Sequence, residues 1–132
     1  MMKALIVEDE SVTRLLLKRL LTRFFPHNVL EAADGEEGLV VLERERPAIV
    51  FCDVHMPKLD GTEFISRLRA HPEFATLPVI VMSAAKDRDL VLKLVELKIA
   101  DYIMKPIDLE QTFKRLERLL PALLPSPEAA ES

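Results

Sequence analysis

The sequence predicts an α/β fold in which a doubly wound parallel sheet of five strands carries helices on both faces. Short apolar runs alternate with longer segments of helical spacing along most of the 132 residues, and the nine prolines fall almost entirely between these segments. The run at residues 48–52 is apolar at every position, as a central parallel strand covered on both faces must be. Because right-handed crossovers lay each helix back on the sheet, this alternation indicates a (βα)5 architecture.

Five short apolar runs are the expected strands, and each leads into a polar residue or a turn. They lie at residues 3–7, 29–33, 48–52, 79–82 and 100–104. The run at 79–82 is also apolar on both faces, which favours a second central strand. An Asp34-Gly35 turn closes the run at 29–33.

The first two expected helices follow from apolar positions spaced at about 100° per residue. Residues 11–25 place leucines and phenylalanines on one wide arc, which Arg14 interrupts, and Pro26 ends the segment. Residues 36–44 form a shorter helix that stops before Pro47.

The remaining helices are indicated by their capping residues. Thr62 can cap the third helix, and the fourth spans residues 87–97. Asp108 caps the last helix with Gln111 three residues on, which is a capping-box pattern, and this helix runs to Pro121.

The fourth helix has more apolar residues than one buried stripe requires. We expect a single inward arc made of Leu90, Val91, Leu94, Val95 and Leu97. Leu92 lies about 160° to 200° from Leu90 and Leu94 on the helix. It is either a lone exposed leucine or a contact for a partner.

Length, charge and cysteine content exclude several classes of function. About 130 residues can bury a self-sufficient core, so we expect one domain at residues 1–120 and a tail or linker stub at 121–132. A formal net charge of −4 disfavours nucleic acid as a direct ligand. No apolar stretch is long enough to span a membrane, and the single Cys52 cannot form an internal disulfide, so the cytoplasm is the expected compartment. The three glycines are spaced too widely for a dinucleotide or phosphate-binding loop.

Polar residues collect where the expected strands end. The first strand runs into Glu8 and Asp9, the third into Asp53, the fourth into Ser83 and the fifth into Lys105. In parallel sheets these carboxyl ends share one edge, where ligands bind. Taken singly, such an acid is more often a helix cap or a solvated loop residue, but a cluster of three acids calls for a compensating cation. Oxygen ligands without clustered histidines favour Mg²⁺.

Four segments together resemble the receiver domain of two-component response regulators, over about residues 3–120. They are VEDE at residues 7–10, DVHMPKLDG at 53–61, MSA at 82–84 and DYIMKP at 101–106. The resemblance implies the flavodoxin-like strand order 2-1-3-4-5, which places the first and third strands side by side.

The resemblance also implies a role for each acidic residue. Asp53 would be the phosphoacceptor, taking its phosphoryl group from a sensor histidine kinase, a phosphotransfer protein or a small acyl phosphate. Asp9, Asp53 and the backbone carbonyl of His55 would bind Mg²⁺ directly, and Glu8 would hold it through water. The His55 side chain would modulate the lifetime of the phosphoryl group.

The other motif residues would complete the site and its switch. Lys105, the Ser83 hydroxyl and the Ala84 backbone amide would bind phosphoryl oxygens, and Pro106 would follow a cis peptide bond that aims Lys105. Ser83 and Tyr102 would move together on phosphorylation and change the face made by the fourth helix, fifth strand and fifth helix. A downstream protein or effector domain would bind that face.

Two positions depart from the usual family pattern, and two other functions compete with a receiver. Ser83 replaces the commoner threonine, and Lys98 stands where many receivers have glycine, so the turn there would differ or hold a strained lysine. A receiver is a signalling domain that assists its own phosphotransfer and dephosphorylation, and is not otherwise an enzyme. An α/β phosphatase with an aspartate nucleophile would usually carry a second Asp at the position of His55. An electron carrier with bound flavin would need more stacking aromatics than the seven present.

Overall fold

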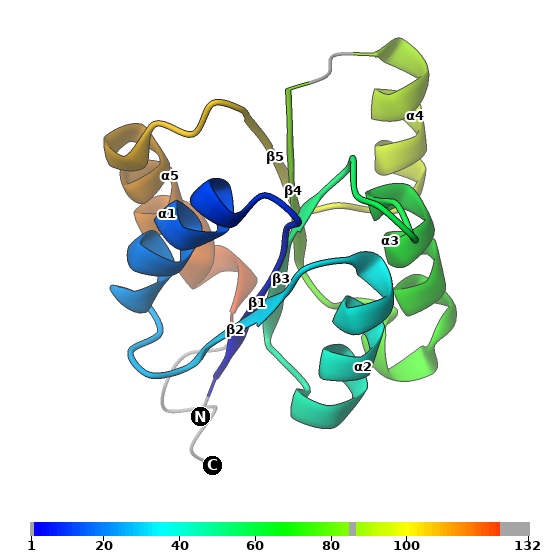
Figure 1. Ribbon diagram of the computed structural model, residues 1–132, viewed down its shortest axis with the longest axis horizontal. Helices are drawn as coiled ribbons and strands as arrows, with labels where there is room; N and C mark the ends of the chain where they lie inside the picture. Colours follow the sequence, from blue (N-terminus) through cyan, green and yellow to red (C-terminus); the bar gives the residue numbers. More distant parts are fainter. Residues whose placement is uncertain (1, 85–86, 125–132) are drawn as a thin grey trace.

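Five parallel strands form one sheet in the order β2-β1-β3-β4-β5, which confirms the predicted fold class (Figure 1). The computed structural model describes residues 2–84 and 87–124. The strands are β1 (Ala4–Val7), β2 (Val29–Ala32), β3 (Ile49–Asp53), β4 (Val79–Ser83) and β5 (Asp101–Met104). Each lies within one residue of its predicted position.

The helices cover both faces of the sheet. They are α1 (Ser11–Thr22), α2 (Gly35–Glu45), α3 (Gly61–Ala70), α4 (Arg88–Glu96) and α5 (Leu109–Leu123), with a short 3-10 turn η1 (Pro72–Phe74) after α3. Helices α1 and α5 lie on one face, and α2, α3 and α4 lie on the other (Figure 1). Within the described ranges, no helix has the length and apolar composition that a bilayer span requires.

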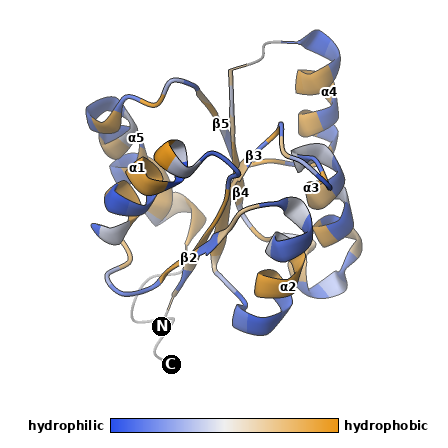
Figure 2. Cartoon of the chain, viewed as in Figure 1, coloured by the Kyte–Doolittle hydropathy of each residue, from blue (hydrophilic) through white to orange (hydrophobic). Residues whose placement is uncertain are grey.

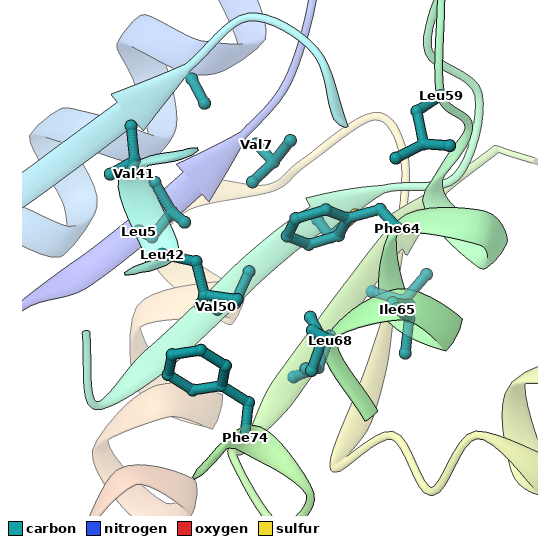
Figure 3. Packing of buried hydrophobic residues seen from close by; sticks show 14 of the residues in the cluster. Leu5, Val7, Val41, Leu42, Val50, Leu59, Phe64, Ile65, Leu68 and Phe74 are labelled. Carbon is teal, nitrogen blue, oxygen red and sulfur yellow. The ribbon is translucent and has the colours of Figure 1, made fainter. Parts of the chain in front are cut away.

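Two apolar cores follow from the alternation of side chains along the strands. Ile6 and Phe51 face α1 and α5, whereas Leu5 and Val50 face the other three helices. The helices present their apolar side to the sheet and their polar side outward (Figure 2). Phe64 of α3 lies over the sheet in the second core (Figure 3).

Helix ends differ from the predictions where local hydrogen bonds favour another residue. Asp60, not Thr62, caps α3, because its carboxylate accepts the backbone N–H of Glu63 at 3.0 Å. Helix α1 ends at Thr22, earlier than expected, although Phe25 beyond it is buried. The apolar periodicity continues past the helix because Phe24 and Phe25 of the following turn still pack against the core.

Helix α5 continues through Pro121 and ends at Leu123, so the prediction that it stops at the proline was wrong. Proline lacks the N–H for one helical hydrogen bond, but this loss falls in the last turn. Leu123 and Leu124 pack against the core under α1 and α5, and this contact favours the extra helical residues. The expected tail thus contributes its first residues to the fold, and residues 125–132 lie outside the described part of the chain.

Helix α4 buries a narrower stripe than predicted. Leu94 is buried, but Val91 and Val95 are 43% and 66% exposed, against the expectation that both point inward. Leu92 is exposed as expected, at 54%, but it is not alone. Leu90 packs against the core beside Leu94, whereas Val91, Leu92 and Val95 line a hollow that they share with Tyr102.

Lys98, in the turn after α4, adopts a backbone conformation that glycine favours, and the sequence predicted that a lysine there would be strained. Lys98 has φ of 57°, in the left-handed region. The Arg69 guanidinium donates hydrogen bonds to the carbonyls of Leu97 and Lys98, and also to those of Phe74 and Leu77. Arg69 therefore ties the end of α3 to this turn and compensates its strain.

Candidate functional site

The predicted site residues meet at one edge of the sheet because of the strand register. Val7 of β1 pairs with Cys52 of β3, so the residues that follow each strand lie side by side. The backbone N–H of Lys105 donates to the carbonyl of Ser83 at 3.0 Å, which joins the ends of β5 and β4. Residues spread over nearly a hundred positions of sequence thus surround one small space.

Three carboxylates form the centre of this space. One oxygen from each of Glu8, Asp9 and Asp53 lies within 4.8 Å of the others. Glu8 is fully buried and Asp53 is 5% exposed, whereas Asp9 is exposed. Oε2 of Glu8 is buried and has no hydrogen-bond partner among the described residues. An unpartnered carboxylate oxygen beside two further acids is the donor set that a hard divalent cation prefers, so the residues fit Mg²⁺.

Lys105 is the cation that already faces these acids. Its Nζ lies 2.7 Å from Oε1 of Glu8 and 3.2 Å from Oδ2 of Asp53. Burial alone would lower the pKa of Lys105, but the hydrogen bond to Glu8 and the charge of Asp53 outweigh it and raise that pKa. The ammonium group therefore stays charged beside the Asp53 carboxylate.

Glu8 is a clustered acid whose pKa is raised by its surroundings. Burial raises the pKa of Glu8 to about 7, and the neighbouring Asp53 adds to the rise, although the hydrogen bond from Lys105 opposes it. One positive charge does not balance the acids around it. The metal-free site therefore takes up a proton at a pH where an ordinary carboxylate is ionised.

The loop after β3 holds the Asp53 side chain and brings the chain back over it. The backbone N–H of His55 donates to Oδ1 of Asp53 at 3.4 Å, and the His55 side chain is exposed. A Cβ on Gly61 would lie 2.4 Å from the carbonyl oxygen of Asp53 and 2.7 Å from Cα of Val54, so only glycine fits there. This close approach packs the start of α3 against the Asp53 backbone.

The remaining predicted residues surround the acid cluster at different depths. Ser83 is buried at the end of β4, and Ala84 follows it at the surface. The Lys105–Pro106 peptide bond is cis. Tyr102 is half-buried in β5 and lines a hollow of about 580 Å³ together with residues of α4.

Two contacts at the site were not predicted from the sequence. One is the direct contact of Lys105 with Glu8. The other is a hydrogen bond of 2.8 Å from the Arg14 guanidinium to the backbone carbonyl of Glu8. The only sequence signal for this contact was that Arg14 interrupts the apolar arc of its helix.

Comparison with known proteins identifies relatives over most of the chain. A family model described as the response regulator receiver domain matches residues 4–117. A probable chemotaxis protein CheY from Rhizobium etli is 32% identical over 121 residues, which cover 92% of this chain and 94% of that protein. A probable C4-dicarboxylate response regulator, DctR, from Bacillus subtilis is 34% identical over 117 residues, but these cover 88% of this chain and only 51% of that protein.

A solved structure supports the same comparison. The phosphorylated cyanobacterial phytochrome response regulator RcpA matches with a TM-score of 0.82 and 30% identity, over 95% of this chain and 99% of that one. The similarity therefore covers the whole sheet and every strand end at which the site residues lie.

Proposed function

The chain belongs to the response regulator receiver family of two-component signalling, and on this premise we propose that Asp53 is its phosphoacceptor. The observation that carries the proposal is the cluster of Glu8, Asp9 and Asp53 with Lys105 against it. Asp53 is the member of the cluster that ends a strand at the centre of the sheet, with Lys105 within 3.2 Å of its carboxylate. An entering phosphoryl group would therefore meet a positive charge as soon as it binds.

The proposed reaction is a nucleophilic substitution at phosphorus. A carboxylate oxygen of Asp53 forms the new O–P bond, and the P–N bond to a phosphohistidine of a sensor kinase or phosphotransfer protein breaks. The electron pair of that bond returns to the imidazole nitrogen. With an acyl phosphate, the P–O bond breaks instead and a carboxylate leaves. Lys105 would pair with one phosphoryl oxygen, and the Ser83 hydroxyl and Ala84 amide would bind another.

Mg²⁺ is the cofactor included in this proposal. Asp9, Asp53 and the carbonyl of His55 would hold it directly, and Glu8 would hold it through water. When bound, the cation offsets the negative charge of the phosphoryl oxygens as they approach the carboxylates. The unpartnered Oε2 of Glu8 supports this assignment, because a buried carboxylate oxygen otherwise lacks compensation.

The proposed output is a change on the face of α4, β5 and α5. Ser83 would move towards the phosphoryl group, and Tyr102 would follow into the space that it leaves. The hollow beside Tyr102 is lined mostly by apolar groups, among them Val91, Leu92 and Met104, which suits a downstream protein or effector domain. The proposal includes a role as a signalling domain and not as a turnover enzyme, and a cytoplasmic location. It also includes a receiver domain at residues 1–120 followed by the tail or linker expected at 121–132, whose first residues α5 takes up.

Incubation with Mg²⁺ and acetyl phosphate, followed by intact mass measurement, tests the proposal. The native chain should gain one phosphoryl group, and Asp53→Asn should gain none. Asp34→Asn is the matched control, because Asp34 follows β2 at the same edge but caps α2 instead of joining the cluster. No mass gain in the native chain, or an equal gain in Asp53→Asn, would reject the assignment. Repeated turnover of phosphomonoesters would instead favour the phosphatase.

A further inference from the structure

The turn between β1 and α1 carries two of the three clustered acids, Glu8 and Asp9. The Glu10 side chain, just before α1, accepts a hydrogen bond from the Thr13 hydroxyl but caps no backbone N–H of the helix. Asp9 is exposed, so packing does not orient its carboxylate. Lys105 holds the Glu8 carboxylate, so the direction of the Asp9 side chain is the one that depends most on how the main chain of this turn is fixed.

The main chain at Glu8 is fixed from two sides. Its N–H donates to the carbonyl of Ala32 on β2 at 3.0 Å, and its carbonyl accepts the hydrogen bond of 2.8 Å from Nη1 of Arg14. The peptide unit between Glu8 and Asp9 is planar, so a fixed carbonyl oxygen also fixes the direction in which Asp9 leaves the turn. One contact from Arg14 thus orients the backbone of both acids.

The Arg14 guanidinium is itself held by β2. Its Nε lies 3.5 Å from Oε1 of Glu31, and the Arg14 side chain is only 24% exposed. Glu31 also pairs with Lys18, one turn further along α1, at 3.0 Å. Lys18 has the same charge, the same helix and the same carboxylate partner as Arg14, but its one hydrogen bond is to that carboxylate and not to the acidic turn.

We propose that Arg14 is a positioning residue for the divalent cation, because its guanidinium bridges Glu31 on β2 to the Glu8 carbonyl and so holds the acidic turn in a shape that can bind metal. The proposal deepens the function proposed above and rests on it. Arg14 touches neither the cation nor the phosphoryl group. It acts as the partners that orient metal ligands do in other sites.

Charge alone predicts the opposite effect, and this makes the proposal testable. Removing a positive charge near three carboxylates strengthens cation binding if electrostatics is all that Arg14 contributes. Removing the contact that shapes the turn weakens cation binding instead. The sign of the change in Mg²⁺ affinity therefore separates positioning from bulk charge.

Calorimetric titration with Mg²⁺ alone, on the native chain, Arg14→Met and Lys18→Met, measures that sign. We expect Arg14→Met to bind about tenfold more weakly, at the lower end of the effect of losing a partner that orients a metal ligand. Lys18→Met should bind as the native chain does or slightly more tightly. In acetyl phosphate reactions, Arg14→Met should need more Mg²⁺ for half-maximal phosphorylation yet reach the native rate at saturation. A merely structural role would not produce this split.

Two further measurements keep the outcome decisive. Without metal, amide hydrogen exchange of the Glu8–Asp9 segment should be faster in Arg14→Met than in Lys18→Met. If Arg14→Met does not fold, Arg14→Lys keeps the positive charge but lacks the planar fork that spans Glu31 and the Glu8 carbonyl, so it should weaken Mg²⁺ binding in the same direction, by less. Equal Mg²⁺ affinity in Arg14→Met and Lys18→Met, or native affinity in Arg14→Lys, would overturn the inference. Absence of Mg²⁺ binding and of phosphorylation in the native chain would overturn the proposed function as well.

Discussion

Mg²⁺ binding should depend on pH through Glu8, across a range where ordinary carboxylates no longer titrate. Burial raises the pKa of Glu8 to about 7, so roughly one tenth of the metal-free chains have it ionised at about pH 6 and nine tenths at about pH 8. Cation binding favours the ionised form and releases the proton. The apparent Mg²⁺ affinity should therefore rise about tenfold between about pH 6 and pH 8, and little above that.

Isothermal titration at several pH values, in buffers of different ionisation enthalpy, measures both the affinity and the proton release. Glu8→Gln should bind Mg²⁺ more weakly at high pH and lose most of the slope, because its side chain has no proton to release. Glu31→Gln is an unsuitable control, since it alters the acidic turn, so Glu45→Gln is preferable: Glu45 pairs with Lys3 near the amino ends of the strands. A slope that is the same in Glu8→Gln as in the native chain would refute the reasoning.

The free energy of unfolding of the metal-free chain should fall as the pH rises, whereas Mg²⁺ affinity rises. A carboxyl group with a raised pKa in the folded state contributes most below its unfolded value of 4.5, and the contribution is lost as the pH rises through about 7. Gly61→Ala should cost about 1–3 kcal/mol in urea unfolding and slow phosphorylation, because the added Cβ displaces the Asp53 backbone; an unchanged rate would contradict the close approach. Arg69→Ala should cost about 2 kcal/mol by the same unfolding assay, because four backbone carbonyls lose a charged donor; native stability would show that water replaces it. Lys98→Gly should add about 0.5–1 kcal/mol, since glycine adopts φ of 57° without strain, and a lower unfolding midpoint would argue that the Lys98 side chain contributes more than its backbone costs.

The sequence was most informative where the apolar pattern of a strand and the polar residue at its end indicate the same boundary. The strand at residues 48–52 is apolar on both faces and ends at Asp53, so both its central place and the position of the acid follow from the pattern. Helix boundaries were less predictable, because Asp60 and Thr62 are both good caps and only the three-dimensional turn decides between them. Pro121 shows the same limit, since distant packing of Leu123 determines whether a helix continues past it.

Side chains on α4 show a second limit of the pattern. Helical spacing groups Val91 and Val95 with Leu94, but it does not tell how wide a stripe the sheet can cover at that place. Contacts from a side chain to a distant backbone carbonyl leave even less trace in a sequence. The hydrogen bond of Arg69 to Lys98 is of this kind, because it joins elements whose proximity only the fold establishes. The bond of Arg14 to Glu8 is local, but its geometry depends on the turn that starts α1.

Burial is the main reason that the pKa of Glu8 is raised, and the charge balance of the site links that rise to the expected metal. When ionised, Glu8, Asp9 and Asp53 carry three negative charges, and Lys105 returns one positive charge, which leaves the cluster two charges short. A proton on Glu8 supplies one of these charges in the metal-free chain, whereas a divalent cation supplies both. Proton and cation therefore compete for the same deficit, and a bound phosphoryl group, which adds negative charge beside Asp53, strengthens the demand for the cation and for Lys105 together.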